Sequence, residues 1–174
     1  MDEGRNRLFA RLADLGIATT TVAYPAHRTV EEGKARRGSM PGQFTKNLLL
    51  RDKKGALFLI VACEDRNIDL KTLHKSIGAQ GRLGFAAPDM LHTALGCEPG
   101  SLTPFAVIND REGQVVVILD ASLMTAERLN FHPLVNTECT SIAPRDLIAF
   151  LDACGRHFQL LDFPEMVGDD ATSR

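Results

Sequence analysis

The sequence lacks any apolar run long enough to cross a bilayer. Its longest uninterrupted apolar stretch extends only from Ala56 to Cys63, whereas a membrane-spanning helix needs ~20 apolar residues. The N-terminal segment carries Arg5, Arg7 and Asp14 and so contains no apolar stretch of the kind found in secretory signals. We therefore expect a cytoplasmic protein that does not associate with membranes.

Closely spaced cysteines are also missing. The four cysteines, Cys63, Cys97, Cys139 and Cys154, lie far apart and form no C-x-x-C pair, the spacing that is common in structural zinc sites. Free cysteines are usually small buried hydrophobic residues, and we expect these to be reduced and mostly buried. A catalytic cysteine stays an alternative, although nothing in the local sequence distinguishes one. We predict neither a metal nor a cofactor.

Two phosphate-binding motifs are absent. No G-x-G-x-x-G follows a predicted strand, and there is no G-x-x-x-x-G-K-[ST]. Such glycine-rich loops cradle the phosphates of dinucleotides and nucleoside triphosphates. Their absence argues against dinucleotide redox chemistry and against nucleotide hydrolysis.

An excess of positive charge is missing as well. The 20 lysines and arginines are balanced by 22 acidic residues, which gives a net charge of −2. Broad nonspecific binding to nucleic acid depends on a large positive field and is therefore not expected. Basic residues do gather locally, and each cluster is either a solvated surface or part of a phosphate-binding patch. The clusters are Lys34, Arg36 and Arg37; Lys53 and Lys54; and Lys71, Lys75 and Arg82.

What is present is a mixture of short helices and strands that fits one domain. Helical spacing and capping patterns, including a Thr29/Glu32 capping box, predict helices at residues 6–15, 29–37, 69–77, 88–95 and 144–154. Apolar and β-branched runs predict strands at 19–24, 44–50, 57–63, 105–108, 114–119, 128–131 and 137–142. Two hairpins are expected, at 44–63 and 105–119. We predict a single α/β domain over residues 1–164 with a mixed, largely antiparallel sheet flanked by helices, and a frayed tail over 165–174.

Three short segments place polar or conformationally special residues beside predicted strands. They are Thr45-Lys46-Asn47, Gly100 to Pro104, and Asn130 to Pro133. Lys46 either faces solvent or points into a pocket to hold an anion, because lysine is rarely buried without a partner.

The other two segments are also open to two interpretations. Glycine allows a close backbone approach and proline rigidifies the exit, so the loop from Gly100 to Pro104 is either a plain turn or a source of N–H donors for an oxyanion. His132 precedes a proline, which favours extended backbone geometry, and it either orients a substrate or caps a turn.

Together these segments resemble the YbaK-like family of editing domains associated with prolyl-tRNA synthetase. The similarity lies in Lys46-Asn47, in the G-x-x-x-P segment that begins at Gly100 and continues as F-A-V-I-N-D, and in N-F-H-P-L-V-N-T from Asn130. It extends from the N-terminal helix to about Leu161, and three motifs in the same order are more specific than any one of them. The last stretch most resembles the free-standing ProXp-ala subclass, which removes alanine from tRNA specific for proline.

The resemblance implies a distorted barrel and a cleft for the 3′ acceptor end of an aminoacylated tRNA. It further implies hydrolysis of the aminoacyl ester, with the substrate's own 2′-hydroxyl helping to position water, and prolyl-tRNA synthetase as a partner. The catalytic candidates are Lys46, Gly100 and His132. Substrate contacts are expected from Val30, Asn47, Ser101, Leu102, Thr103, Pro104 and Phe105, and tRNA contacts from Lys34, Arg36, Arg37 and Arg82.

Two alternatives remain at this stage. The same fold could act on cysteine or another small amino acid attached to the same tRNA. The chain could also be a non-catalytic nucleic-acid-binding module that uses only its basic patches, although Lys46 and the glycine loop favour an enzyme and the modest net charge disfavours a general nucleic-acid binder.

Overall fold

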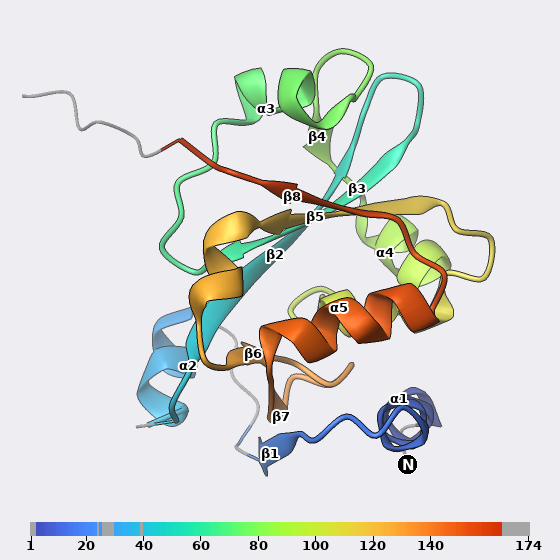
Figure 1. Cartoon of the computed structure of the whole chain (residues 1–174). Coiled ribbons are helices and arrows are strands. Elements are labelled where there is room, and N and C mark those ends of the chain that lie inside the picture. The colour runs from blue at the N-terminus through green and yellow to red at the C-terminus, as the bar shows by residue number, and fades with distance from the viewer. Residues whose placement is uncertain (1–2, 24, 26–29, 39, 165–174) are drawn as a thin grey trace, which may run out of the picture.

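The strands of the chain form one mixed sheet, as Figure 1 shows for the computed structural model, which describes residues 3–23, 25, 30–38 and 40–164. The strand order is β1-β7-β6-β2-β3-β5-β8, with β4 paired to β2 outside that path. The bounds are β1 (Thr20–Ala23), β2 (Gln43–Arg51), β3 (Leu57–Cys63), β4 (Gly84–Phe85), β5 (Val115–Asp120), β6 (Leu129–Phe131), β7 (Glu138–Ile142) and β8 (Phe158–Leu161).

Antiparallel and parallel pairings are mixed within this sheet. The pairs β1–β7, β6–β7, β2–β3 and β2–β4 are antiparallel. The pairs β2–β6, β3–β5 and β5–β8 are parallel. The predicted α/β domain with a mixed sheet flanked by helices is therefore confirmed.

Helices cover both sides of the sheet. They are α1 (Glu3–Asp14), α2 (Val30–Arg36), α3 (Leu70–Ile77), α4 (Pro88–Leu95) and α5 (Pro144–Ala153), with the 3₁₀ helices η1 (Pro104–Asn109) and η2 (Ala121–Thr125). In Figure 1, α5 and α3 lie on opposite sides of β5 and β8. None of the described helices is long and apolar enough to cross a membrane.

Strand β3 is apolar throughout because both of its faces are buried. Leu59 and Val61 belong to the larger core, which also holds buried residues of α1 and α5. Phe58 and Ile60 belong to a second core on the other face, together with Leu73 of α3. Successive side chains of a strand point to opposite faces, so a continuous apolar run is what a central strand between two cores requires.

The turn of the first hairpin is held by one carboxylate. Asp52 accepts hydrogen bonds from the amides of Lys54, Ala56 and Gln80 at 2.8–2.9 Å, and Gly55 supplies a φ of 91°. The hydrogen bond from Gln80 is the largest reason that the pKa of Asp52 lies below its ordinary value. The predicted hairpin at 44–63 is confirmed, and Asp52 ties its turn to the loop that follows α3.

The second predicted hairpin, at 105–119, is wrong. Residues 105–108 belong to η1, and β5 pairs in parallel with β3 and β8. Pro104 starts η1 with a preset φ, and the Thr103 hydroxyl accepts from the Phe105 amide at 3.3 Å. A short apolar run has the same composition in a buried 3₁₀ turn as in a strand, so composition alone does not distinguish the two. Here the Thr103 cap and Pro104 favour the 3₁₀ helix.

Other expectations have mixed outcomes. The predicted strands at 128–131 and 137–142 correspond to β6 and β7, and the helix predicted at 144–154 corresponds to α5. The short strands β4 and β8 were not expected from the sequence. The capping residue Thr29 and the tail 165–174 lie outside the described residues.

Candidate functional site

The N-terminal half of β2 is where the three sequence segments meet. Residues 44–47 of this strand, which we call the β2 segment, are all partly buried. The alternation of a strand directs Phe44 and Lys46 toward one face and Thr45 and Asn47 toward the other. Each face makes a different set of contacts.

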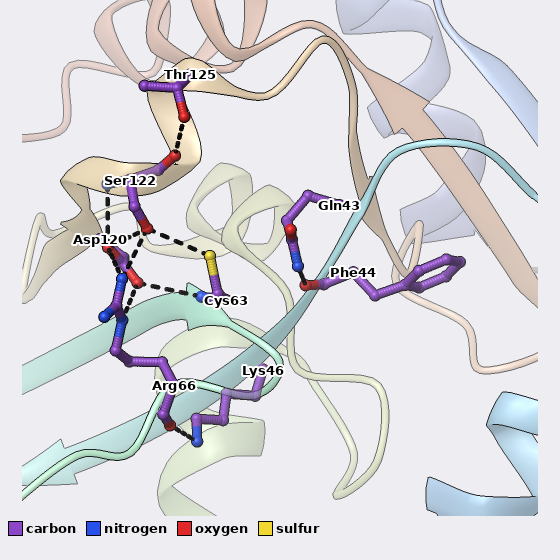
Figure 2. A network of polar contacts seen from close by, with 8 residues as sticks. All are labelled: Gln43, Phe44, Lys46, Cys63, Arg66, Asp120, Ser122 and Thr125. Carbon is purple, nitrogen blue, oxygen red and sulfur yellow. Dashed lines mark hydrogen bonds and ion pairs between the residues drawn. The ribbon is translucent and has the colours of Figure 1, made fainter. Parts of the chain in front are cut away.

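On one face, Lys46 is half-buried rather than free in solvent. Its ammonium donates to the main-chain carbonyl of Arg66, in the connection between β3 and α3 (Figure 2). A carbonyl carries no net charge, so this contact orients the ammonium and leaves its positive charge unneutralised. The geometry is compatible with a lysine that holds an anionic group of a ligand.

On the other face, Asn47 joins the strand to the glycine loop. Its side-chain Nδ2 donates to the Leu102 carbonyl at 3.1 Å. Its Oδ1 is buried and has no hydrogen-bond partner among the described residues. The β2 segment thus carries Lys46 on one side and supports the loop from Gly100 to Pro104 on the other. Among the described residues, no hydrogen bond joins Lys46 to that loop.

The glycine loop exposes less than the sequence suggested. Ser101, Thr103, Pro104 and Phe105 are buried. The Ser101 hydroxyl donates inward to the Glu98 carbonyl at 3.0 Å. Gly100 is exposed and Leu102 partly exposed, so these two positions present the surface of the loop.

The backbone of the loop has a conformation that favours glycine at position 100. Gly100 has a φ of 91°, a conformation that side chains with a Cβ rarely adopt. The Ser101 amide is engaged with the Glu98 carbonyl at 3.0 Å. The amides of Gly100 and Leu102 have no hydrogen-bond partner in the part of the chain that the structure describes, which leaves them able to donate to a ligand.

Phe105 supports this loop from the core. It is fully buried and packs edge-on against Phe131 and Phe150, with ring centroids 5.6 Å away in each case. We predicted that Phe105 would line a substrate pocket. The structure places it beneath the loop, where it has no exposed surface.

The third segment reaches the β2 segment through strand β6. Phe44 is paired in parallel with Asn130, and the Thr45 hydroxyl donates to the Asn130 carbonyl at 3.2 Å. Lys46 and His132 each lie two residues beyond these paired positions. His132 is half-buried, and its Nδ1 lies 2.9 Å from the Glu138 carbonyl, so that nitrogen carries the proton and the ring orientation is set by β7.

The basic residues separate into two groups. Arg37 lies beside the β2 segment, with its guanidinium 3.8 Å from the centroid of the Phe44 ring and 2.8 Å from Glu64. Lys34 is 3.9 Å from Glu64 and 3.8 Å from Asp65. Arg82 is exposed next to β4, which pairs with the opposite end of β2, so it does not join this group.

The side chains of two residues predicted to contact the substrate or the tRNA are not among those that the structure describes. Val30 and Arg36 are the first and last residues of α2, and their side chains lie outside the described part of the structure. Their predicted roles stay predictions.

A groove opens next to Arg37. It runs past the edge strand β1, where Val22 is 42% exposed. Its lining residues are Thr20, Val22, Arg37, Met40, Pro41, Arg128 and Ser141. Arg128 is held in place by Ser141, to which Nε and Nη2 donate at 3.0 and 2.6 Å.

The residues that sequence reasoning missed form a polar cluster that is connected to Lys46 through Arg66. Asp120 is 1% exposed and lies 2.9 Å from Nε of Arg66. It also accepts from Ser122 Oγ at 2.7 Å and from the Cys63 amide at 3.3 Å. Burial raises the pKa of Asp120, but the hydrogen bonds from Ser122 and Arg66 outweigh that effect and lower the pKa below its ordinary value. The only sequence signal was a carboxylate at the end of an apolar strand.

Burial makes two of the four cysteines poor candidates for a nucleophile. Cys97 and Cys139 are buried, and burial raises the pKa of Cys97 to about 12. Burial also raises the pKa of Cys154. A thiol acts as a nucleophile only as the thiolate, so Cys97 and Cys154 are unsuited to that role. Among the described residues, no group of three His, Cys, Asp or Glu side chains could hold a metal ion.

Most of this chain matches a known class of domain. Residues 24–150 match the aminoacyl-tRNA editing domain family. The chain belongs to this family, and it is an aminoacyl-tRNA hydrolase. The YbaK-like resemblance inferred from the sequence is thereby confirmed.

Individual relatives are similar along almost their whole length. The chain is 32% identical to the prolyl-tRNA editing protein ProX of Acetoanaerobium sticklandii, over 92% of this chain and 98% of that protein. It is 34% identical to the prolyl-tRNA synthetase associated domain-containing protein 1 of Bos taurus, over 92% of this chain and 96% of the relative. A solved structure described as a candidate trans-editing enzyme for prolyl-tRNA synthetase has the same fold, with a TM-score of 0.70, 20% identity and coverage of 94% and 99%.

Proposed function

We propose that this chain acts in trans on mischarged tRNA specific for proline and removes alanine from it. The observation that carries the proposal is that the β2 segment contacts all three sequence segments: it carries Lys46 on one face, holds the glycine loop through Asn47 on the other, and pairs with the strand that leads to His132. The names of the relatives, which refer to prolyl-tRNA editing and prolyl-tRNA synthetase, support the tRNA. The N-F-H-P-L-V-N-T stretch supports alanine as the amino acid.

The reaction is hydrolysis of the ester between the amino acid and the terminal ribose. Water attacks the carbonyl carbon, the carbonyl oxygen becomes an oxyanion, and the ester C–O bond breaks as the ribose oxygen takes a proton. Donors that are already positioned around the oxyanion lower this barrier most. The amides of Gly100 and Leu102 are the proposed donors, because neither is used within the loop.

Lys46 and His132 have supporting roles in this proposal. The Lys46 ammonium holds the terminal phosphate or ribose, while the substrate's own 2′-hydroxyl positions the attacking water. His132 orients the substrate from the end of β6, with its ring set by the Glu138 carbonyl. Arg37 and Lys34 are proposed contacts for the tRNA phosphates near the same strand, for which they would exchange their present ion pairs with Glu64. Prolyl-tRNA synthetase, the enzyme that produces the mischarged substrate, is the proposed partner.

Selection by size is the reason for a separate editing site. An aminoacylation pocket cannot strongly reject a smaller amino acid, because a missing methylene contributes only ~1–3 kcal/mol of discrimination. A second site that admits only small residues supplies the remainder. Leu102 is partly exposed beside the loop and, with Val30, is the proposed wall that excludes the proline ring.

The selectivity prediction tests this function directly. One tRNA specific for proline is charged in turn with alanine, cysteine, serine and proline, and the release of each amino acid is timed. We expect alanine to be released fastest and proline to be retained, by a factor of about ten or more. Comparable rates for alanine and proline would contradict the proposal. A clear preference for cysteine would move the chain to the other subclass, and no release of any amino acid would favour a binding module.

A second prediction concerns the backbone of the loop. Gly100→Val should lower the free energy of unfolding by roughly 1–2 kcal/mol, because a residue with a Cβ resists positive φ, and it should also slow deacylation. Crowding is not the reason, since a Cβ at Gly100 would meet no atom of the described residues within 4 Å. The matched control is Gly84→Val, where φ is not in the positive range and a Cβ would likewise meet none of the described atoms within 4 Å. Equal behaviour of the two variants in urea unfolding and in turnover would contradict the prediction.

A further inference from the structure

Lys46 is oriented by a group that is itself held by a buried ion pair. The acceptor of its hydrogen bond is the main-chain carbonyl of Arg66. The amide of Arg66 donates to the Cys63 carbonyl at 2.9 Å, so this carbonyl belongs to a tight turn at the end of β3. The position of that turn decides where the lysine ammonium points.

The side chain of Arg66 pins this turn to the end of β5. Its Nε lies 2.9 Å and its Nη2 3.4 Å from the two carboxylate oxygens of Asp120, and Nη2 also donates to Ser122 Oγ at 3.0 Å. Arg66 is 19% exposed and Asp120 1% exposed. Figure 2 shows the continuous series of contacts from Asp120 through Arg66 to Lys46.

Asp120 is fixed independently of Arg66. Its carboxylate accepts from the amide and the hydroxyl of Ser122 at 3.0 and 2.7 Å and from the Cys63 amide at 3.3 Å. These contacts anchor the carboxylate to η2 and to the end of β3. A rigid, charged anchor at this place restricts the Arg66 guanidinium, since charge-assisted paired hydrogen bonds have a strong geometric preference.

We infer that Asp120 and Arg66 are positioning residues for Lys46 and set the direction of its ammonium toward the substrate. Neither residue touches the substrate. This inference rests on the function proposed for Lys46. If Asp120 and Arg66 only stabilised the fold, replacing Arg66 would change the reaction rate by the same factor with and without Lys46. A positioning role predicts different factors in the two backgrounds.

The first test is a double-mutant cycle on single-turnover deacylation of Ala-tRNA(Pro). Arg66→Ala is measured alone and together with Lys46→Ala. In the presence of Lys46 we expect Arg66→Ala to slow the reaction about tenfold. In the Lys46→Ala background the same substitution should have little further effect, because the effects of substitutions at energetically coupled residues are not additive. Arg66→Lys, which keeps one charge but loses the paired geometry, should recover part of the rate.

The chain provides a matched control for this cycle. Arg156 also pairs with a buried carboxylate, since its Nη1 lies 3.5 Å from Asp110, with exposures of 13% and 1%. Arg156→Ala should reduce the rate by the same small factor whether or not Lys46 is present. An equal loss from Arg66→Ala in both backgrounds would overturn the inference and leave the function of Lys46 intact. Wild-type turnover in Lys46→Ala would instead contradict the function proposed for that lysine.

A second measurement does not depend on residual activity. The side-chain ammonium signal of Lys46, assigned by its loss in Lys46→Arg, is followed by ¹H–¹⁵N correlation in the free protein. We expect Arg66→Ala, or Arg66→Lys if the alanine variant does not fold, to shift or broaden this signal, and Arg156→Ala to leave it in place. An unchanged Lys46 signal in the Arg66 variant would overturn the inference.

Discussion

Lys46→Ala should slow the deacylation of mischarged tRNA by at least about tenfold while the protein stays folded. The lysine is the one cation that the β2 segment carries, and its charge is not neutralised by the carbonyl that orients it. Removing a fixed positive group that stabilises a phosphate, or the negative charge that develops in the transition state, commonly lowers the reaction rate by one or more orders of magnitude. Single-turnover release of alanine and thermal unfolding are measured on the same preparation.

The control for Lys46→Ala is Lys54→Ala. Lys54 is exposed in the hairpin turn at the other end of β2, so its removal changes the net charge equally but leaves the proposed site untouched. We expect wild-type turnover for Lys54→Ala. A folded Lys46→Ala protein with wild-type turnover would contradict the role of Lys46.

Phe105→Ala should lower the free energy of unfolding by about 3–5 kcal/mol, the usual cost of removing a large buried aromatic side chain. Phe105 is fully buried between Phe131 and Phe150, so the substitution would leave a cavity beneath the glycine loop. Urea unfolding of wild type and variant gives the difference directly.

Phe85→Ala is the matched control, because Phe85 is 67% exposed and surface substitutions usually change stability by less than about 0.5 kcal/mol. If Phe105→Ala were as mild as Phe85→Ala, Phe105 would not be the core support of the loop. It would then be free to line a substrate pocket, as the sequence first suggested.

Much of the fold could be predicted because local signals agreed with the tertiary structure. The helix at 88–95 begins at Pro88 and ends at Gly96, and the structure has α4 with those features. The hairpin at 44–63 likewise carried its own turn chemistry in Asp52 and Gly55. Helices and hairpins of this kind can be predicted because their own residues include the signals that start, turn or end them.

Elements that depend on distant partners could not be predicted in the same way. Residues 105–108 have the composition of a strand, but Thr103 and Pro104 start a 3₁₀ helix there. Strand β8 is recognisable only through its parallel pairing with β5. Strand propensity depends strongly on such context, and parallel neighbours lie far apart in the sequence.

The residues of the candidate site likewise divide into those that carry a local sequence signal and those that depend on distant contacts. Lys46, Asn47 and the segments at 100–104 and 130–133 each carried a local signal, and the structure brings them to one strand. Arg66 and Asp120 carried almost none, because an arginine in a loop and an aspartate at a strand end are ordinary features until their 2.9 Å contact is seen. The burial of Ser101 and Thr103 likewise depends on how the loop packs.

The most direct measurement is a crystal structure of the chain with a hydrolysis-resistant analogue in which alanine is joined by an amide bond to the 3′-terminal adenosine. We predict that the alanyl carbonyl oxygen accepts hydrogen bonds from the amides of Gly100 and Leu102. We also predict that the Lys46 ammonium contacts the ribose or the adjoining phosphate. An analogue bound away from the β2 segment, for example entirely in the groove between Val22 and Arg128, would contradict the proposed site.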